Sequence, residues 1–201
     1  MTKFFFFTGL IAVLFTGCKK DDADTPGTGN IVYQKLDSVL GYQQHVTLKI
    51  DNDSIADIFL GSSLVMHNNV SHLYLYAATN SKTLHKILVD PGNMEQVNGF
   101  PGYPLQNGVV ISSTGYNNCT WTRSPYKAIL ADITDAGDNK VFNGLWKNLE
   151  KHYLGIQLII NDKTHFGWIC ISHEKDTQVL KIHDLAYNAV PDQPLQAGKR
   201  S

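Results

Sequence analysis

Charged residues are scarce in this chain. Only 17% of its 201 residues are Asp, Glu, Lys or Arg, and the formal net charge is −1. Because proteins that bind nucleic acid present clustered cationic side chains, this composition predicts no nucleic-acid partner. The lack of an acidic excess, together with 43% hydrophobic residues, excludes a disordered chain and is typical of an exported β protein.

The short motifs that mark reactive centres are also missing. The eight histidines form no HExxH pair and the three cysteines form no CxxC pair, so two common zinc signatures are absent. There is no GxSxG nucleophile motif and no glycine-rich phosphate loop. We therefore predict no catalytic residue. The alternative is a secreted hydrolase, directed at glycan or protein, whose acid and base are carboxylates far apart in the sequence.

The first 17 residues have the pattern of a secretory signal. A short cationic segment precedes the apolar run FFFFTGLIAVLF, which is too short to cross a membrane core that needs about 20 helical residues. The run leads into Thr16, Gly17 and Cys18, and this segment resembles the lipobox of bacterial lipoproteins, although Phe15 stands where leucine is usual. The resemblance implies that Cys18 is acylated and anchors the protein in a membrane. The alternative is an ordinary signal peptide with an incidental cysteine.

Residues 18–30 are predicted to form a flexible tether. CKKDDADTPGTGN begins with charged residues and continues with small polar residues, glycine and proline. The charged cluster resembles the signal that certain Gram-negative bacteria place after the lipidated cysteine of surface lipoproteins. It implies display on the surface of the outer membrane, with the inward-facing leaflet as the alternative.

Residues 31–201 are predicted to fold as one antiparallel β-sandwich domain. Short segments of alternating polarity are separated by turn residues, which is the pattern of half-buried strands. The clearest pair is a predicted hairpin in which Asn161, Asp162 and Lys163 form the turn. The predicted strands are residues 45–50, 71–78, 107–112, 155–160, 165–172 and 177–187.

The second strand of that hairpin has two different faces. Trp168, Cys170 and Ser172 share one face, and Ile169 and Ile171 share the other, because side chains alternate along a strand. We expect one face in the core and the other partly exposed.

Residues 140–155 are the exception to the β pattern. Phe142, Leu145, Leu149 and Tyr153 recur at helical spacing and predict at most one short helix, which Gly144 weakens by about 1 kcal/mol relative to alanine.

The C-terminal strands resemble part of a group of exported bacterial proteins of unknown function. The resemblance is carried by HYLGIQLIINDKTHFGWICIS and LKIHDLAYNAVPDQPLQAG, with KIDNDSIADIF as a weaker match, and Asn188 replaces a glutamate. It implies an all-β secreted or surface protein and transfers no catalytic residue. The matching residues are Tyr153, Gly155, Thr164, His165, Gly167, Trp168, Asp184, Ala186, Tyr187, Pro191, Pro194, Ala197 and Gly198.

Asp51, Asp53 and Asp57 form the strongest candidate metal site. Oxygen ligands at alternate positions of a tight loop are the arrangement that binds calcium. Lys49 stands where the first ligand is expected, and Ser54 replaces the glycine that eases the turn. The alternative is that these carboxylates only bond to their own turn. No other cofactor is predicted.

Aromatic residues in turn-rich segments are candidate ligand contacts. Tyr116, Trp121 and Trp146 are predicted to stack against a sugar ring or a partner side chain, with burial in the core as the alternative. Cys119 and Cys170 could pair as a disulfide or remain free thiols. We thus expect a membrane-anchored envelope lipoprotein of unknown activity whose domain is a binding or structural module for a glycan or protein.

Overall fold

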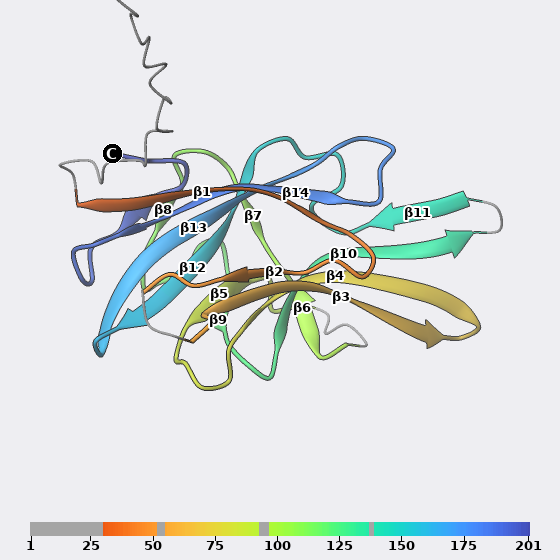
Figure 1. Ribbon diagram of the computed structural model, residues 1–201, viewed down its shortest axis with the longest axis horizontal. Coiled ribbons are helices and arrows are strands. Elements are labelled where there is room, and N and C mark those ends of the chain that lie inside the picture. Colours follow the sequence, from red (N-terminus) through yellow and green to blue (C-terminus); the bar gives the residue numbers. More distant parts are fainter. Residues whose placement is uncertain (1–29, 52–54, 93–96, 137–138) are drawn as a thin grey trace, which may run out of the picture.

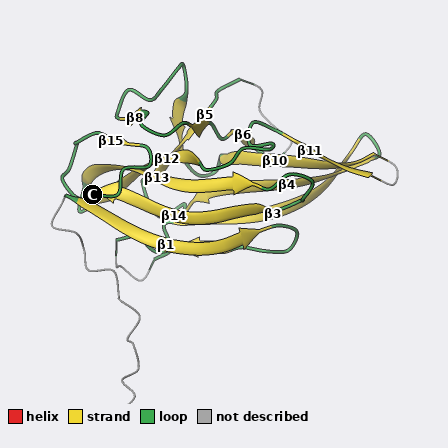
Figure 2. Cartoon of the chain, turned by 90° about the horizontal axis from the view of Figure 1, so that it is seen from above, coloured by secondary structure: helices red, strands yellow, loops and turns green. Residues whose placement is uncertain are grey.

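The computed structural model describes residues 30–51, 55–92, 97–136 and 139–201 (Figure 1). Within these ranges the chain consists of strands and loops, and Figure 2 shows no helix. Two large sheets pack against each other, which confirms the predicted all-β fold. No helix in these ranges is long and apolar enough to cross a membrane. The predicted signal and Cys18 lie outside the described residues.

The first sheet has seven strands and pairs the beginning of the domain with its end. β1 (Ile31–Leu40) is an edge strand and lies antiparallel to β14 (Leu180–Asn188). The order continues through β13 (Lys163–His173), β12 (His152–Ile160), β5 (Lys86–Val89) and β9 (Thr120–Thr122), and β7 (Pro104–Leu105) also pairs with β12.

The second sheet has six strands. Their order is β11 (Asn139–Asn143), β10 (Lys127–Ala136), β4 (Val70–Thr79), β3 (Ile58–His67) and β2 (Val46–Leu48). β6 (Gly99–Pro101) pairs with β10 in parallel, whereas the other pairs are antiparallel. A small separate sheet joins β8 (Val110–Ile111) to β15 (Leu195–Gln196).

The predicted hairpin is confirmed as β12 and β13. Its turn residues Asn161 and Asp162 have φ values of 49° and 60°, which suits a two-residue turn that follows the twist of the strands. Lys163, which was also predicted in the turn, is instead the first residue of β13 and pairs with Ile160. Ile169 and Ile171 point into the main core, whereas Trp168 and Cys170 point to the opposite side. The predicted division into two faces is therefore confirmed, but both faces are buried.

The main core lies between the two sheets. Leu60 and Leu75 reach it from the second sheet, and Leu154 and Ile169 reach it from the first, all with no exposed surface. Burying a side chain of this size contributes about 1.5–3 kcal/mol, so this layer is the principal source of stability.

A second core covers the outer face of the first sheet. The excursion, which we define as residues 102–119 between β6 and β9, contributes Leu105 and Ile111, which pack with Trp168 of the sheet. Leu195, from the C-terminal segment, belongs to the same cluster. Because both of its faces are covered, β13 is buried continuously from His165 to Ile171 instead of alternating between buried and exposed residues.

No helix forms over residues 140–155, where the sequence pattern allowed at most one short helix. This segment forms β11, a turn and the start of β12. Gly144 and Asn148 have φ values of 114° and 56°, and these left-handed conformations interrupt a helix. Phe142 is buried while Leu145 is 43% exposed, so residues at helical spacing do not share one face.

Candidate functional site

Asp51 and Asp57 lie together at one end of the sandwich, beside a histidine that the sequence did not indicate. One ligand atom from each of Asp51, Asp57 and His85 lies within 4.8 Å of the other two. Asp57 directly precedes β3 and His85 directly precedes β5, so the cluster joins the two sheets. Asp53 lies outside the described residues.

Asp57 is completely buried, and its carboxylate, its main-chain N–H and its carbonyl all form hydrogen bonds. Its carboxylate accepts the main-chain N–H of Ile50 at Oδ2 and lies 2.7 Å from His85 Nε2 at Oδ1. Its main-chain N–H donates to Leu48 at 2.9 Å, and its carbonyl accepts from Asn80 at 3.0 Å. A buried carboxylate is tolerated only with such partners, so Asp57 fixes the loop between β2 and β3.

The hydrogen bonds of His85 assign its tautomer. Nδ1 accepts the main-chain N–H of Ile159 at 2.9 Å, so the ring proton resides on Nε2 and is donated to Asp57. Both ring nitrogens are therefore occupied, and the ring is 1% exposed. This arrangement differs from a catalytic Asp–His pair, in which the second nitrogen must reach a substrate or nucleophile.

The same geometry limits the ions that the cluster could hold. A metal on His85 Nε2 would have to displace the proton that bonds to Asp57. The carboxylate oxygens of Asp51 and Asp57 keep lone pairs of the type that calcium prefers. Calcium at Asp51, Asp53 and Asp57 therefore stays a prediction, with His85 as a partner of Asp57 and not as a ligand.

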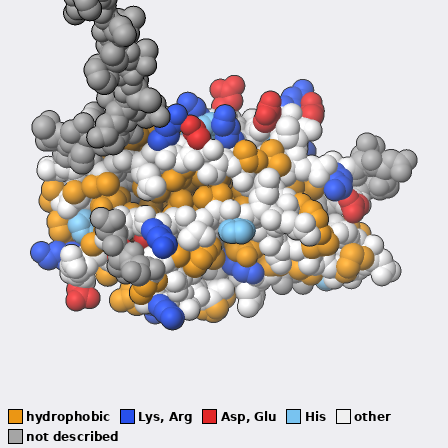
Figure 3. All heavy atoms as spheres, viewed as in Figure 1, with side chains coloured by type: hydrophobic (Ala, Val, Ile, Leu, Met, Phe, Trp, Pro, Cys, Tyr) orange, Lys and Arg blue, Asp and Glu red, His pale blue; other side chains and the backbone are white. Residues whose placement is uncertain are grey.

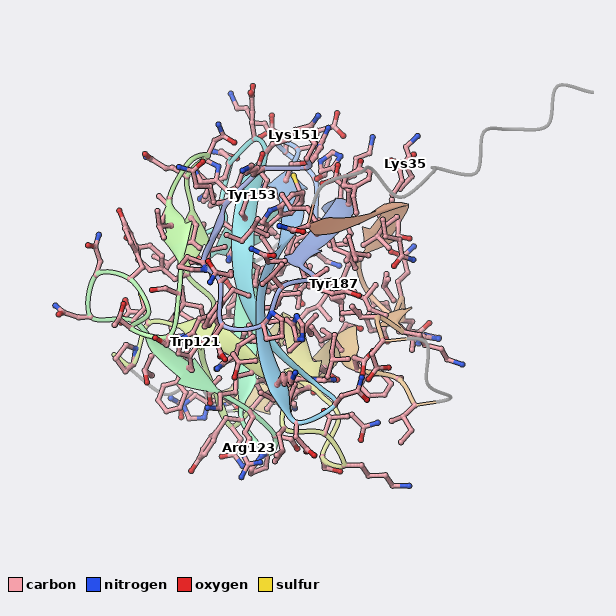
Figure 4. The ribbon with its side chains drawn as sticks, turned by 90° about the vertical axis from the view of Figure 1, so that its left-hand side faces the viewer. Lys35, Trp121, Arg123, Lys151, Tyr153 and Tyr187 are labelled. Carbon is pink, nitrogen blue, oxygen red and sulfur yellow. The ribbon has the colours of Figure 1, made fainter. Side chains whose placement is uncertain are left out.

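Two more polar rings lie at this end of the sandwich. Tyr187 lies on the side of the molecule that Figure 4 presents. Burial and the negative charges of Asp51 and Asp57 raise the pKa of Tyr187. The ring of His165 meets that of Tyr187 edge-on at 6.1 Å, and its Nδ1 lies 2.8 Å from the carbonyl oxygen of Asn188. A surface hollow of about 300 Å³ opens beside the two rings, so this end is accessible next to the buried pair.

Of the predicted aromatic contacts, Trp146 does not reach the surface. Its side chain is completely buried in the main core, and its indole N–H donates to the carbonyl oxygen of Gly102 at 2.8 Å. A buried tryptophan whose N–H has a partner is a structural residue, so Trp146 is removed from the candidate ligand contacts.

Tyr116 lies in the excursion between β6 and β9, whereas Trp121 is the middle residue of β9 and pairs with Leu88 of β5. Both side chains are partly exposed. The ring of Tyr116 is 5.9 Å from that of Tyr103, and the ring of Trp121 is 6.3 Å from that of Phe166. Figure 4 labels Trp121. The indole N–H of Trp121 donates to the carbonyl oxygen of Ser112. These rings pack against the second core and still present part of their surface to solvent.

A second buried carboxylate, Asp184, was not singled out from the sequence as a site. It is 5% exposed, accepts the hydroxyl of Tyr33 at 3.1 Å and pairs with Arg200 at 2.6 Å. Arg200 also lies over the ring of Tyr33, 5.2 Å from its centre. The C-terminal segment is thereby fastened to β1 and β14.

The two described cysteines are free thiols. Cys119 and Cys170 are both buried, so the disulfide alternative is not realised. Burial, with a contribution from Asp90, raises the pKa of Cys119 to about 11. Burial and Asp184 raise the pKa of Cys170 to about 12. Neither thiol has the depressed pKa of a reactive cysteine.

Searches against known protein families, curated proteins and solved structures find no match for this chain. The resemblance of its C-terminal strands to an exported family therefore stays a prediction.

Proposed function

We propose that the protein is a lipid-anchored lipoprotein of the outer membrane, displayed on the cell surface, whose β-sandwich is a binding module. The lipobox-like segment ending at Cys18 supports the anchor, and the charges that follow it support surface display. β1 begins at Ile31, directly after the tether. A flexible tether of twelve or so residues spans roughly 20 Å, which separates the domain from the lipid headgroups.

The proposed ligand is a glycan, bound at β9 and at the excursion between β6 and β9. The observation that carries this proposal is the partial exposure of three rings that pack on the second core, Tyr103 and Tyr116 from the excursion and Trp121 from β9. Aromatic rings of this kind offer an apolar face together with a polar edge, which suits the stacking of a sugar ring.

The polar neighbours of these rings support the same ligand. Asn117 and Asn118 are exposed on the turn between Tyr116 and Trp121, and Arg123 is exposed just after β9 (Figure 4). Amide and guanidinium groups are the hydrogen-bonding partners that sugar hydroxyls require beside a stacking ring. The alternative ligand at the same rings is a protein, and a glycan array distinguishes the two.

A glycan array probed with the full-length protein in detergent tests the proposal. We expect binding to a defined glycan class and about a tenfold loss of affinity in Trp121→Ala, since one aromatic contact contributes about 0.5–1.5 kcal/mol beyond its buried area. Tyr42→Ala is the matched control, because Tyr42 is 55% exposed outside the excursion.

The absence of any glycan ligand, or equal binding by Trp121→Ala, would contradict the glycan proposal. Running the array with calcium and with a chelator separates direct binding from binding that depends on the predicted ion at Asp51, Asp53 and Asp57.

A further inference from the structure

The second half of β3 has a strand partner on one side only, among the residues that the structure describes. β3 pairs with β4 along all ten of its residues, but β2 pairs only with Ile58, Phe59 and Leu60. The turn before β2 reaches two residues further along β3, where the N–H of Gln43 donates to Oγ of Ser62. Among the described residues no strand pairs with residues 63–67 on this side, and we call these residues the distal edge.

The edge strands β1, β2 and β9 have features that discourage the addition of another strand, and β11, the opposite edge of the second sheet, is five residues long and carries Lys140. β1 has a register shift between Lys35 and Ser38, and Asp37 within it has a φ of 41° and pairs with Lys35 at 2.7 Å. β2 and β9 have only three residues each. Bulges, charges and short strands are how proteins protect sheet edges, so the distal edge is unusual within this molecule.

The distal edge also lacks charge. No Asp, Glu, Lys or Arg occurs from Ile58 to Ser81, a stretch that includes all of β3 and β4. The lower right of Figure 3, over the far end of β3, correspondingly shows hydrophobic and uncharged polar side chains. Leu64 is 55% exposed and Met66 is 67% exposed, so two large apolar side chains on one face of the strand are open to solvent.

The apolar surface continues from the edge onto the inner face of the sheet. Leu64 lies opposite Leu73 of β4, and a hollow of about 160 Å³ beside them is also lined by Tyr42 and Ile133. The polar part of its lining consists of Ser71, Asp135 and Lys140. A strand added at the distal edge would extend the sheet and place its own side chains beside Leu64 and Met66.

We propose that the occupant of the distal edge is a second copy of this chain, with the two β3 strands paired antiparallel about a two-fold axis. A two-fold interface brings the same patch of both subunits together, so Leu64 and Met66 of each copy would cover those of the other. Two uncharged strand edges do not repel each other, and the hollow beside them carries one charge of each sign, Asp135 and Lys140, so a second copy meets no net repulsion there. The six-stranded sheets of the two copies then form one continuous sheet.

Sedimentation equilibrium of the full-length chain in density-matched detergent tests this proposal. We expect a protein mass twice that of the monomer, and at least a tenfold higher dissociation constant for the double substitution Leu64→Lys, Met66→Lys. Val110→Lys is the matched control, because Val110 is 49% exposed and lies on β8. Unchanged circular dichroism and melting temperature show that the double variant is folded.

Hydrogen exchange shows whether the contact uses the strand edge. We expect main-chain amides within residues 61–67 to exchange more slowly in the unsubstituted protein than in the double variant. A monomer at every concentration would overturn the proposal in favour of an extended peptide from another protein. A dimer that survives the double substitution, or unchanged exchange of these amides, would also overturn it.

Discussion

Two buried histidines of this sandwich act as hydrogen-bonding groups between loops and strands. His85 accepts a main-chain N–H at Nδ1 and donates from Nε2, and His173 repeats the pattern. In His173, Nδ1 accepts the N–H of Asn148 at 2.8 Å, and Nε2 lies 3.0 Å from the carbonyl oxygen of Thr177. Each ring therefore requires its neutral form to satisfy the main chain around it.

The Asp57–His85 pair is expected to stabilise the native fold strongly. Asp57→Ala removes the acceptor of His85 Nε2–H and of the Ile50 N–H, and leaves both donors buried without a partner. The expected loss in the free energy of unfolding is about 3–5 kcal/mol, measured by urea denaturation. Asp37→Ala is the control and should change the stability little, because Asp37 is exposed and pairs with Lys35 at the surface. A loss below about 1 kcal/mol for Asp57→Ala would contradict this role.

The buried thiols are expected to make the protein less stable in alkali. An unfolded thiol loses its proton near pH 9, whereas native Cys170 keeps it until about pH 12, so unfolding releases a proton between these values. The stabilising contribution is complete below pH 9 and decreases above it, by at most about 1.4 kcal/mol per pH unit.

Urea unfolding at pH 8, 9 and 10 measures this contribution. In a Cys18→Ser background, Cys170→Ala should lower stability at pH 8, and stability should then fall less steeply with pH than in the parent. Equal slopes for the two proteins would contradict the prediction.

At the scale of the strands, the sequence pattern predicted the elements whose structure depends on neighbouring residues. The β12–β13 hairpin was predicted because its turn residues and alternating side chains are both encoded within residues 155–172. β3 was not predicted, since Gly61, Ser62 and Ser63 interrupt its apolar pattern, and its pairing with β4 supplies the order that the segment lacks. Residues 140–155 have helical spacing of their apolar side chains, but they form strands because β11 pairs with β10 and β12 pairs with β13.

In the candidate site, too, the sequence predicted contacts between residues that are close along the chain and missed contacts between distant residues. The proximity of Asp51 and Asp57 was predictable because they flank one short loop. His85 was not, because it meets Asp57 across 28 residues of sequence and from the other sheet. Trp146 likewise finds its acceptor, Gly102, 44 residues away, and a turn-rich neighbourhood gave no sign that its side chain enters the core.

At the scale of the whole molecule, the proposed anchor at Cys18 is directly testable. The processed protein should incorporate a fatty-acid analogue and partition into the detergent phase, because acyl chains contribute about 0.8 kcal/mol per buried methylene. Cys18→Ser should abolish the label, with Cys119→Ser as a control that keeps it. Persistent labelling of Cys18→Ser would contradict the lipid anchor. Protease treatment of intact cells separately distinguishes outward display from the inward-facing leaflet.

The pairing of β1 with β14 determines when the molecule can fold. Ile31 pairs with Asn188 and Leu40 with Leu180, so a chain synthesised from its N-terminus carries β1 unpaired until residues 180–188 have emerged. Pairing of such distant segments makes folding slow, on the order of milliseconds to seconds for domains rich in these contacts. During that interval the uncharged β3 and β4 segments are exposed as well, and a nascent chain of this topology depends on a holding chaperone more than a domain built from neighbouring hairpins does.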